Sequence, residues 1–252
     1  MNKELTIEEI GKIKNYIKGK KISRRIKKII KKYYEEEKIN KQLNKLYENC
    51  EKNKLCMGKL TNMYGDCLFE SLNYHGIGED VESLRKGLAM ILYIYKNDKE
   101  FLPSKMSLKE MYEMSMDEEI EKVYYKEKKE KKYTKYGYNV MCQDLTVENS
   151  WERIPANIIL ILVSYLYKVE IITVVDYETK NNGISPINFW NEIEHENEIE
   201  KIYIGHICDN HWIPIKEKEE NKELEEEKNE YYTKETEKFN KWAKEILKKI
   251  EE

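Results

Sequence analysis

The sequence predicts an α+β protein, and three observations point to this class. Glycine and proline are scarce among the 252 residues (10 and 4), which disfavours a turn-rich all-β architecture and favours helices. Apolar residues recur at helical spacing through the first part of the chain. Later in the chain the run "VEIITVVD" (169–176) is rich in β-branched residues and predicts a central strand.

Composition restricts the compartment and the kinds of partner. Lys and Arg (45) nearly balance Asp and Glu (48), for a net charge of −3, so nucleic acid is not an expected partner. The most apolar run, 158–166, is shorter than the ~20 residues that span a bilayer, so no membrane span is expected. Five cysteines without a CxxC pair favour a reducing compartment. We expect a cytoplasmic protein, or one in the host cytosol if its source is a virus or a bacterium.

Residues 1–58 are predicted to form a helical N-terminal extension. Ile22, Ile26, Ile29 and Tyr33 lie on one face of a helix, and the opposite face between positions 20 and 32 is basic. We expect this basic face to be an ordinary solvent-exposed helix surface, and the alternative is a patch that binds phosphate or an acidic partner.

Residues 59–216 are predicted to form the main domain, with a mixture of helices and strands. A short helix should begin at Cys67 and end near Asn73, and a longer one should follow the turn "GIGED". The buried stripe of that longer helix is predicted to contain Leu84, Leu88, Ile91, Leu92 and Tyr95.

The remaining elements follow from the same kinds of pattern. The mixed-charge segment 117–135 is expected to be exposed, as helix or partly mobile chain, and 151–167 to be a buried helix. "KIYIGHI" and "HWIPIK" predict two strands around Cys208–Asn210. Residues 217–252 are predicted to form a charged C-terminal segment that ends in an amphipathic helix, whose apolar face would contain Phe239, Trp242, Ala243, Ile246 and Ile250.

Cys67 is the candidate nucleophile, within "YGDCLFESL" (64–72). A catalytic cysteine reacts as a thiolate, and a helix N-terminus or a nearby histidine lowers the pKa of its thiol. Gly65 permits a tight turn, and Cys67 then lies in the first turn of the predicted helix. Backbone N–H groups at this turn could also form an oxyanion hole. The alternative is a buried structural thiol.

The partner histidine must come from elsewhere in the chain. His75 follows the short helix, and His195 lies in an acidic stretch. His206 and His211 flank the loop "ICDN", and Trp212 would shield His211 from water, which favours a neutral base. These features rank His211 first and His206 second.

Four stretches in order resemble the ovarian-tumour (OTU) family of deubiquitinating cysteine proteases. They are "YGDCLFESL", "LRKGLAMILYIYKNDKEFLP", "SWERIPANIILILVSYLYKVEIITV" and "IYIGHICDNHWIPI", and together they cover about residues 60–215. The resemblance implies a papain-like OTU fold, with a small central sheet between helical layers. It also implies hydrolysis of isopeptide bonds, or of peptide bonds, at the C-terminus of ubiquitin or a ubiquitin-like modifier, without a cofactor.

The resemblance also implies roles for particular residues. Cys67 corresponds to the nucleophile, His211 to the general base, and Tyr64, Gly65 and Asp66 to the oxyanion loop. Two positions depart from the family pattern. Tyr64 replaces an Asp three residues before the cysteine, and Ile213 replaces an Asp or Asn two residues after the histidine.

The third member of a catalytic triad is therefore absent from both of its usual positions. Asp209, Asn210 and Asp66 are the candidates to replace it, and a Cys–His pair without a third member is the alternative.

A catalytically impaired OTU-fold module that binds ubiquitin is the rival function. A third reading is a nucleic-acid or membrane-surface protein that works through the basic face at 20–32. A zinc site at His206, Cys208, Asp209 and His211 is disfavoured because no CxxC pair is present and alternate strand residues point to opposite faces.

Overall fold

The computed structural model describes most of the chain. Its described residues are 9, 12–13, 15, 24–62, 65–115, 122–127, 130–135, 137–148, 154–186, 199–207, 211–218, 241 and 243–248, with only the backbone described at 24–36, 122–135 and 186. The chain divides into two compact units, Met1–Asn44 with Glu223–Glu252, and Lys45–Lys222.

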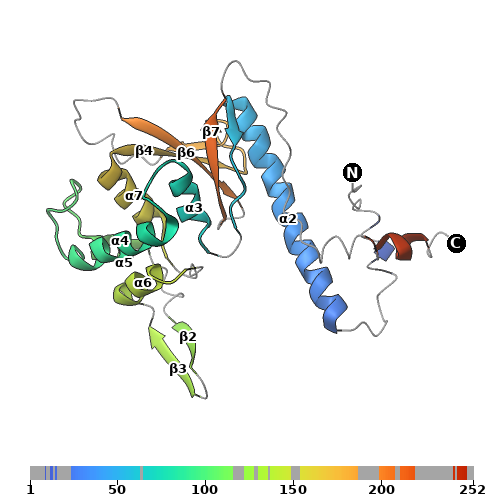
Figure 1. Ribbon diagram of the computed structural model, residues 1–252, viewed down its shortest axis with the longest axis horizontal. Helices are drawn as coiled ribbons and strands as arrows, with labels where there is room; N and C mark the ends of the chain where they lie inside the picture. Colours follow the sequence, from blue (N-terminus) through green and yellow to red (C-terminus); the bar gives the residue numbers. More distant parts are fainter. Residues whose placement is uncertain are drawn as a thin grey trace. The chain divides into compact units, whose positions relative to one another are not determined.

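Five strands of the described chain form the sheet of the second unit, in the order β1-β7-β6-β4-β5 (Figure 1). Strands β4 and β6 are parallel, and the other neighbours are antiparallel. The strand bounds are β1 Leu55–Met57, β4 Val169–Val175, β5 Ile184–Pro186, β6 Glu200–Ile207 and β7 His211–Glu217.

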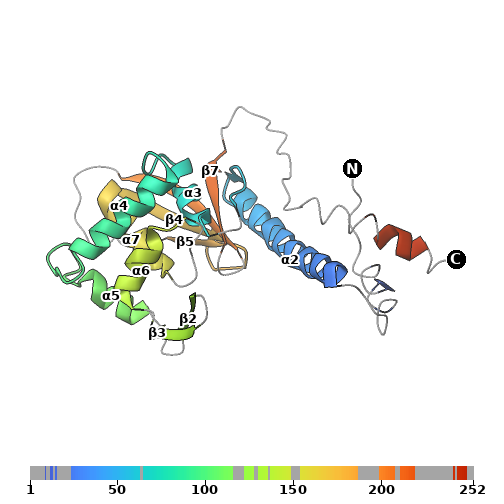
Figure 2. The same cartoon turned by 60° about the horizontal axis from the view of Figure 1, so that its bottom comes forward.

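Helices pack on one face of this sheet and enclose the main core (Figure 2). Buried side chains from the helices meet alternate residues of the strands, such as Ile171 of β4 and Ile204 of β6. The helix bounds are α3 Cys67–Tyr74, α4 Val81–Ile94, α5 Leu108–Ser115, α6 Tyr138–Leu145 and α7 Ala156–Tyr167.

The end of α2 (Arg24–Lys52) packs on the other face of the sheet, through residues from Lys45 onward. A Cβ atom at Gly205 of β6 would lie 2.6 Å from Leu46 Cδ2, so a larger residue there would force the buried Leu46 side chain to shift. Asn49 Nδ2 donates to the carbonyl oxygens of Val175 (2.7 Å) and Tyr177 (3.2 Å) at the end of β4. The α+β class is therefore confirmed, with helices on both faces of a small sheet.

Several sequence predictions agree with the observed elements. The helix from Cys67, the long helix after "GIGED" and the two strands around Cys208–Asn210 are present. The run predicted as a central strand forms β4, which has a neighbour on each side. The middle strand of the five is β6.

Three predictions require correction. The segment predicted as helix or mobile chain contains an antiparallel hairpin, β2 (Lys122–Glu127) and β3 (Glu130–Lys135). Residues 55–57, placed in the helical extension, form β1 because they pair with β7. Tyr95 does not belong to the buried stripe of α4: its side chain is 38% exposed, because the helix ends at Ile94 and the tyrosine ring stacks on Phe101 instead.

The first unit contains the N-terminal part of α2 and a C-terminal helical segment at 243–248. Ala243 and Ile246 of the predicted apolar face are buried. The basic side chains at 20–32 and the other members of that apolar face, Phe239, Trp242 and Ile250, lie outside the described residues. Among the described helices, none is both long and apolar enough to cross a bilayer.

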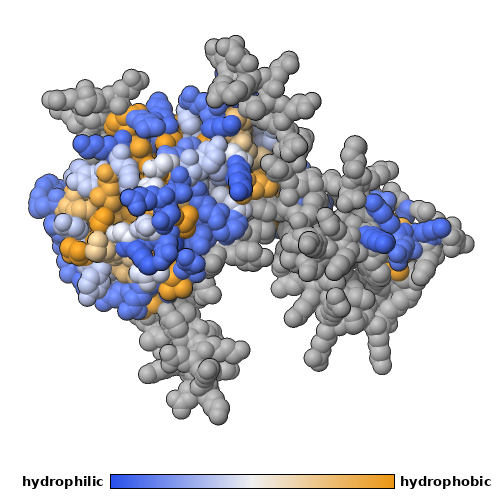
Figure 3. All heavy atoms as spheres, viewed as in Figure 1, coloured by the Kyte–Doolittle hydropathy of each residue, from blue (hydrophilic) through white to orange (hydrophobic). Residues whose placement is uncertain are grey.

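The surface follows the high charge content of the sequence. Figure 3 shows hydrophobic residues scattered among hydrophilic ones over the described part of the visible face. Exposed apolar side chains include Met90, Tyr93 and Ile94 on the outer side of α4.

Candidate active site

Cys67 lies at the start of α3, as the sequence predicts. Gly65 has φ of +99°, a left-handed conformation that glycine adopts without a Cβ clash, and the chain then enters the helix at Cys67. The Cys67 side chain is only 3% exposed. Its sulfur is approached by the backbone N–H groups of Trp212, Leu68 and Cys67 itself.

The contact with Trp212 places the thiol against the first residues of β7. Strand β1 ends at Met57, and the last bond of this ladder runs from the Gly58 N–H to the Pro214 carbonyl oxygen (2.8 Å). Beyond that point Trp212 has its own partners: its carbonyl oxygen accepts from the Thr61 hydroxyl, and its N–H faces the Cys67 sulfur. Cys67 therefore packs against the residue that follows His211.

His211 is the first residue of β7, and its side chain is buried, with 5% exposed. The Nε2 atom lies 3.5 Å from Thr61 Oγ1. The fold thus gathers Cys67, His211 and Thr61 at one end of β7, where the ladder with β1 stops.

Burial controls the protonation of both reactive groups. It raises the pKa of the Cys67 thiol to about 11, although the surrounding backbone N–H groups act in the opposite direction. The pKa of His211 is lowered to about 4, mainly by burial and in addition by the charge of His206. The expected thiolate at the helix N-terminus is therefore not the resting state, because desolvation outweighs the helix. A neutral thiol and a neutral imidazole face the site.

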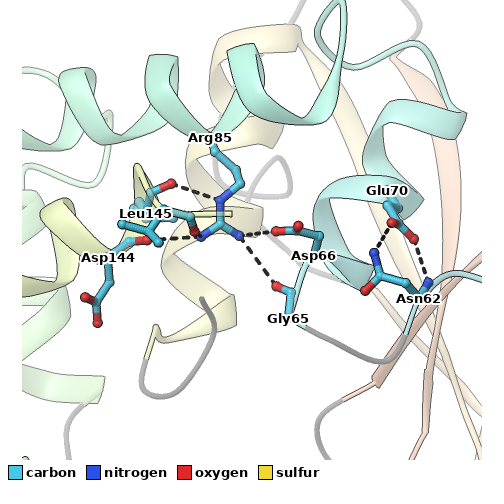
Figure 4. A network of polar contacts seen from close by, with 8 residues as sticks. Asn62, Gly65, Asp66, Glu70, Arg85, Asp144 and Leu145 are labelled. Carbon is cyan, nitrogen blue, oxygen red and sulfur yellow. Dashed lines mark hydrogen bonds and ion pairs between the residues drawn. The ribbon is translucent and has the colours of Figure 1, made fainter. Parts of the chain in front are cut away.

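Asp66 occupies the N-cap position of α3, but its side chain makes no capping hydrogen bond. Instead Arg85 Nη1 donates to Asp66 Oδ1 at 2.6 Å, and both side chains are buried (Figure 4). An aspartate at an N-cap ordinarily accepts from the first-turn N–H groups. Arg85 draws this carboxylate away from the same N–H groups that approach the Cys67 sulfur.

Arg85, from α4, connects the loop before Cys67 to the end of α6. Its guanidinium donates to the carbonyl oxygens of Leu145 (2.9 Å), Asp144 (3.1 Å) and Val147 (2.6 Å). A longer contact of 3.5 Å reaches the Gly65 carbonyl oxygen. The side chain is 1% exposed, so these bonds satisfy a fully buried cation.

A second clamp holds the segment that contains Thr61. Glu70 of α3 accepts from the Asn62 backbone N–H (2.7 Å) and from its side-chain amide (Figure 4). A hollow of about 510 Å³ adjoins this clamp. Its lining includes Leu60, Thr61, Asn62, Glu70, Tyr74 and Pro214.

The other histidines occupy different settings. His75 Nε2 lies 2.8 Å from the Tyr203 carbonyl oxygen, on β6. His206 stacks on Trp212 with ring centroids 4.1 Å apart, so it supports the indole beside the site. His195 lies outside the described residues.

Several sequence candidates also lie outside the described residues, namely Tyr64, Cys208, Asp209 and Asn210. The roles of Asp209 and Asn210 beside His211 therefore stay predictions. Among the side chains that are described, no group of three or more His, Cys, Asp or Glu residues could hold a metal ion.

Sequence reasoning missed Thr61 and the connection from Asp66 to Arg85. Thr61 is separated from His211 by 150 positions, and the pairing of β1 with Ile215–Glu217 of β7, together with the Glu70–Asn62 clamp, brings the two together. Recognising "LCM" (55–57) as a strand is the sequence signal that would have placed Thr61 near β7.

No protein-family model matches the chain, and no curated protein sequence matches it. Among solved structures, the chain is similar to an OTU deubiquitinase from Wolbachia pipientis wMel that was solved bound to ubiquitin. The similarity covers 66% of this chain and 98% of the other, at 12% sequence identity and a TM-score of 0.35, and is therefore distant.

Proposed function

We propose that the chain is an OTU-like cysteine protease that hydrolyses isopeptide bonds at the C-terminus of ubiquitin or a ubiquitin-like modifier. One observation supports this most directly: the Cys67 sulfur faces the backbone N–H of Trp212, directly after His211. Thiol proteolysis requires a cysteine nucleophile and a histidine base, and here the cysteine at the helix N-terminus contacts the backbone of the residue next to a buried histidine.

In this proposal His211 takes the Cys67 proton as the sulfur attacks the carbonyl carbon of the modifier's terminal glycine. The neutral state of His211 suits this role, since only the unprotonated imidazole can accept a proton. Backbone N–H groups at the start of α3 stabilise the oxyanion. The imidazolium then protonates the leaving lysine amine, and a thioester forms on Cys67. Water, deprotonated by His211, hydrolyses the thioester and restores the thiol.

The choice of substrate rests on the sequence resemblance. Four stretches resemble the OTU family in the family's order, and they contribute α3, α4, α7 with β4, and the β6–β7 pair of the main domain. Because Cys67 and His211 are 3% and 5% exposed, entry of the modifier's tail requires the site to open.

The test is reaction with a ubiquitin probe that carries a C-terminal electrophile. The wild-type chain should form an adduct on Cys67, located by peptide mass spectrometry, and Cys67→Ala should form none. Cys142→Ser is the matched control, because Cys142 is also buried and burial raises its pKa to about 11. An adduct on Cys142 or Cys208 would contradict the assignment.

The base is tested separately with a ubiquitin–fluorophore substrate. His211→Ala should lower kcat by ~10²–10⁴-fold, the usual cost of a lost general base. His206→Ala should cost much less, because His206 stacks on Trp212. The reverse ranking would make His206 the base.

A second candidate is a module that binds ubiquitin without cleaving it. The burial of both reactive groups and the neutral thiol of Cys67 favour it. Its signature would be saturable ubiquitin binding by calorimetry together with no probe adduct and no turnover.

A further inference from the structure

One hydroxyl group contacts both the backbone of β7 and the ring of His211. Thr61 Oγ1 donates to the Trp212 carbonyl oxygen and lies 3.5 Å from His211 Nε2. Thr61 is buried, with 6% exposed, and so is His211. The hydroxyl is therefore in a desolvated setting, where its hydrogen bonds are strong and their direction matters.

The direction of these bonds follows from counting protons. A threonine hydroxyl has one proton to donate and two lone pairs to accept with. A carbonyl oxygen can only accept, so the single proton of Thr61 goes to Trp212. Towards His211 the hydroxyl can then act only as an acceptor, which requires the proton of the neutral imidazole to be on Nε2. Nδ1 is left with the lone pair.

The segment around Thr61 is tied to the rest of the domain on both sides. On one side the Gly58 N–H bonds to the Pro214 carbonyl oxygen, and on the other Glu70 binds both the backbone and the side chain of Asn62. Catalytic hydrogen bonds are often long before substrate binds and shorten afterwards, and the 3.5 Å contact fits that behaviour.

We propose that Thr61 is the positioning residue of His211, which holds the imidazole as the Nε2–H tautomer so that Nδ1 can accept the Cys67 proton. This inference rests on the proposed cysteine protease function. In the OTU family, the resemblance assigns the orienting role to an Asp or Asn two residues after the histidine, where this chain has Ile213. Our proposal gives that role to Thr61. A neutral hydroxyl sets the tautomer but does not stabilise the imidazolium as a carboxylate does.

The kinetic test compares two substitutions at Thr61. Thr61→Val keeps the shape and removes the hydroxyl, whereas Thr61→Ser keeps the hydroxyl and removes the methyl group. With a ubiquitin–fluorophore substrate, Thr61→Val should lower kcat roughly 10- to 100-fold with little change in KM, because only the orientation of the base is lost. Thr61→Ser should stay within about threefold of wild type, since the bonding group remains. Equal losses in the two variants would reject the proposal in favour of packing.

Asp209→Ala and Asn210→Ala are the comparison variants, because both residues are sequence candidates for the same task. The proposal expects each to lower kcat less than Thr61→Val does. A larger loss in either one would assign the orienting role to that residue and overturn the proposal.

The tautomer is measured without any substrate. In a long-range ¹H–¹⁵N spectrum at pH 7.5, His211 should show a protonated Nε2 and an unprotonated Nδ1, with the signal assigned through His211→Gln. Thr61→Val should mix the two tautomers, and Thr61→Ser should restore the wild-type pattern. An Nδ1–H tautomer in the wild-type chain would refute the proposal. If the wild-type chain does not react with ubiquitin, the protease function fails, while this spectrum still decides the Thr61–His211 contact.

Discussion

Replacing Arg85 by methionine should destabilise the main domain strongly, because the change removes a buried cation and leaves its partners behind. Asp66, 6% exposed, would keep a carboxylate without its cation. The carbonyl oxygens of Asp144, Leu145 and Val147 would lose their guanidinium donors. Removing one partner of a buried ion pair costs about 3–5 kcal/mol in free energy of unfolding.

The loss is measurable because it is smaller than the stability expected of a domain, about 5–15 kcal/mol. With a urea m-value of about 2 kcal/mol/M, the unfolding midpoint should fall by about 1.5–2.5 M. Tryptophan fluorescence reports the transition. Lys86→Met is the matched control on the same helix: the Lys86–Glu82 pair is solvent-exposed, so this change should leave the unfolding midpoint almost unchanged.

A double-mutant cycle identifies the ion pair as the cause. Asp66→Asn removes the negative charge, and in the double variant with Arg85→Met no uncompensated charge remains. The double variant should therefore be less destabilised than the sum of the two single variants, by about 1–3 kcal/mol. Additive effects, or a loss of less than about 1 kcal/mol in Arg85→Met, would refute the reasoning.

Three further outcomes follow from the same structure. Burial raises the pKa of Cys67 to about 11, so its alkylation by iodoacetamide at pH 7 should be roughly 100-fold slower than that of an unburied thiol. The alkylation rate should keep rising up to about pH 11. A rate that is constant from pH 6 upward would contradict this prediction. His211 has a folded pKa of about 4 against 6.5 unfolded, so its contribution to stability is present above pH 6.5 and is lost on acidification, by about 2 kcal/mol at pH 5. Urea titrations of wild type and His211→Gln at both pH values should show this difference, and equal pH slopes would refute it. Asn49→Ala should cost about 1–3 kcal/mol because it removes a buried hydrogen bond to the Val175 carbonyl oxygen, whereas Asn53→Ala, at a more exposed position, should cost less in the same titration.

The sequence by itself determined the features that depend on near neighbours. Apolar spacing located α4 and α7, and the "VEIITVVD" run located β4. A glycine turn before an apolar helix start marked Cys67, and two short strands around a polar loop marked His211. These features could be read because helical periodicity, glycine conformation and strand propensity are short-range properties. The hairpin β2–β3 was missed because its charged sequence lacks the alternation that identifies a half-buried strand.

Only the tertiary structure decided how those parts meet. Thr61 reaches His211 across 150 positions because β1 pairs with Ile215–Glu217 of β7 and the chain then continues along β7 towards His211, and no local pattern encodes that pairing. Arg85 turns Asp66 away from capping α3 because the two side chains share a buried space formed by α4, α6 and the loop before Cys67. The resting protonation also depends on packing. The sequence shows a helix N-terminus that favours a thiolate, but desolvation, which depends on everything packed around Cys67, outweighs it and keeps the thiol neutral.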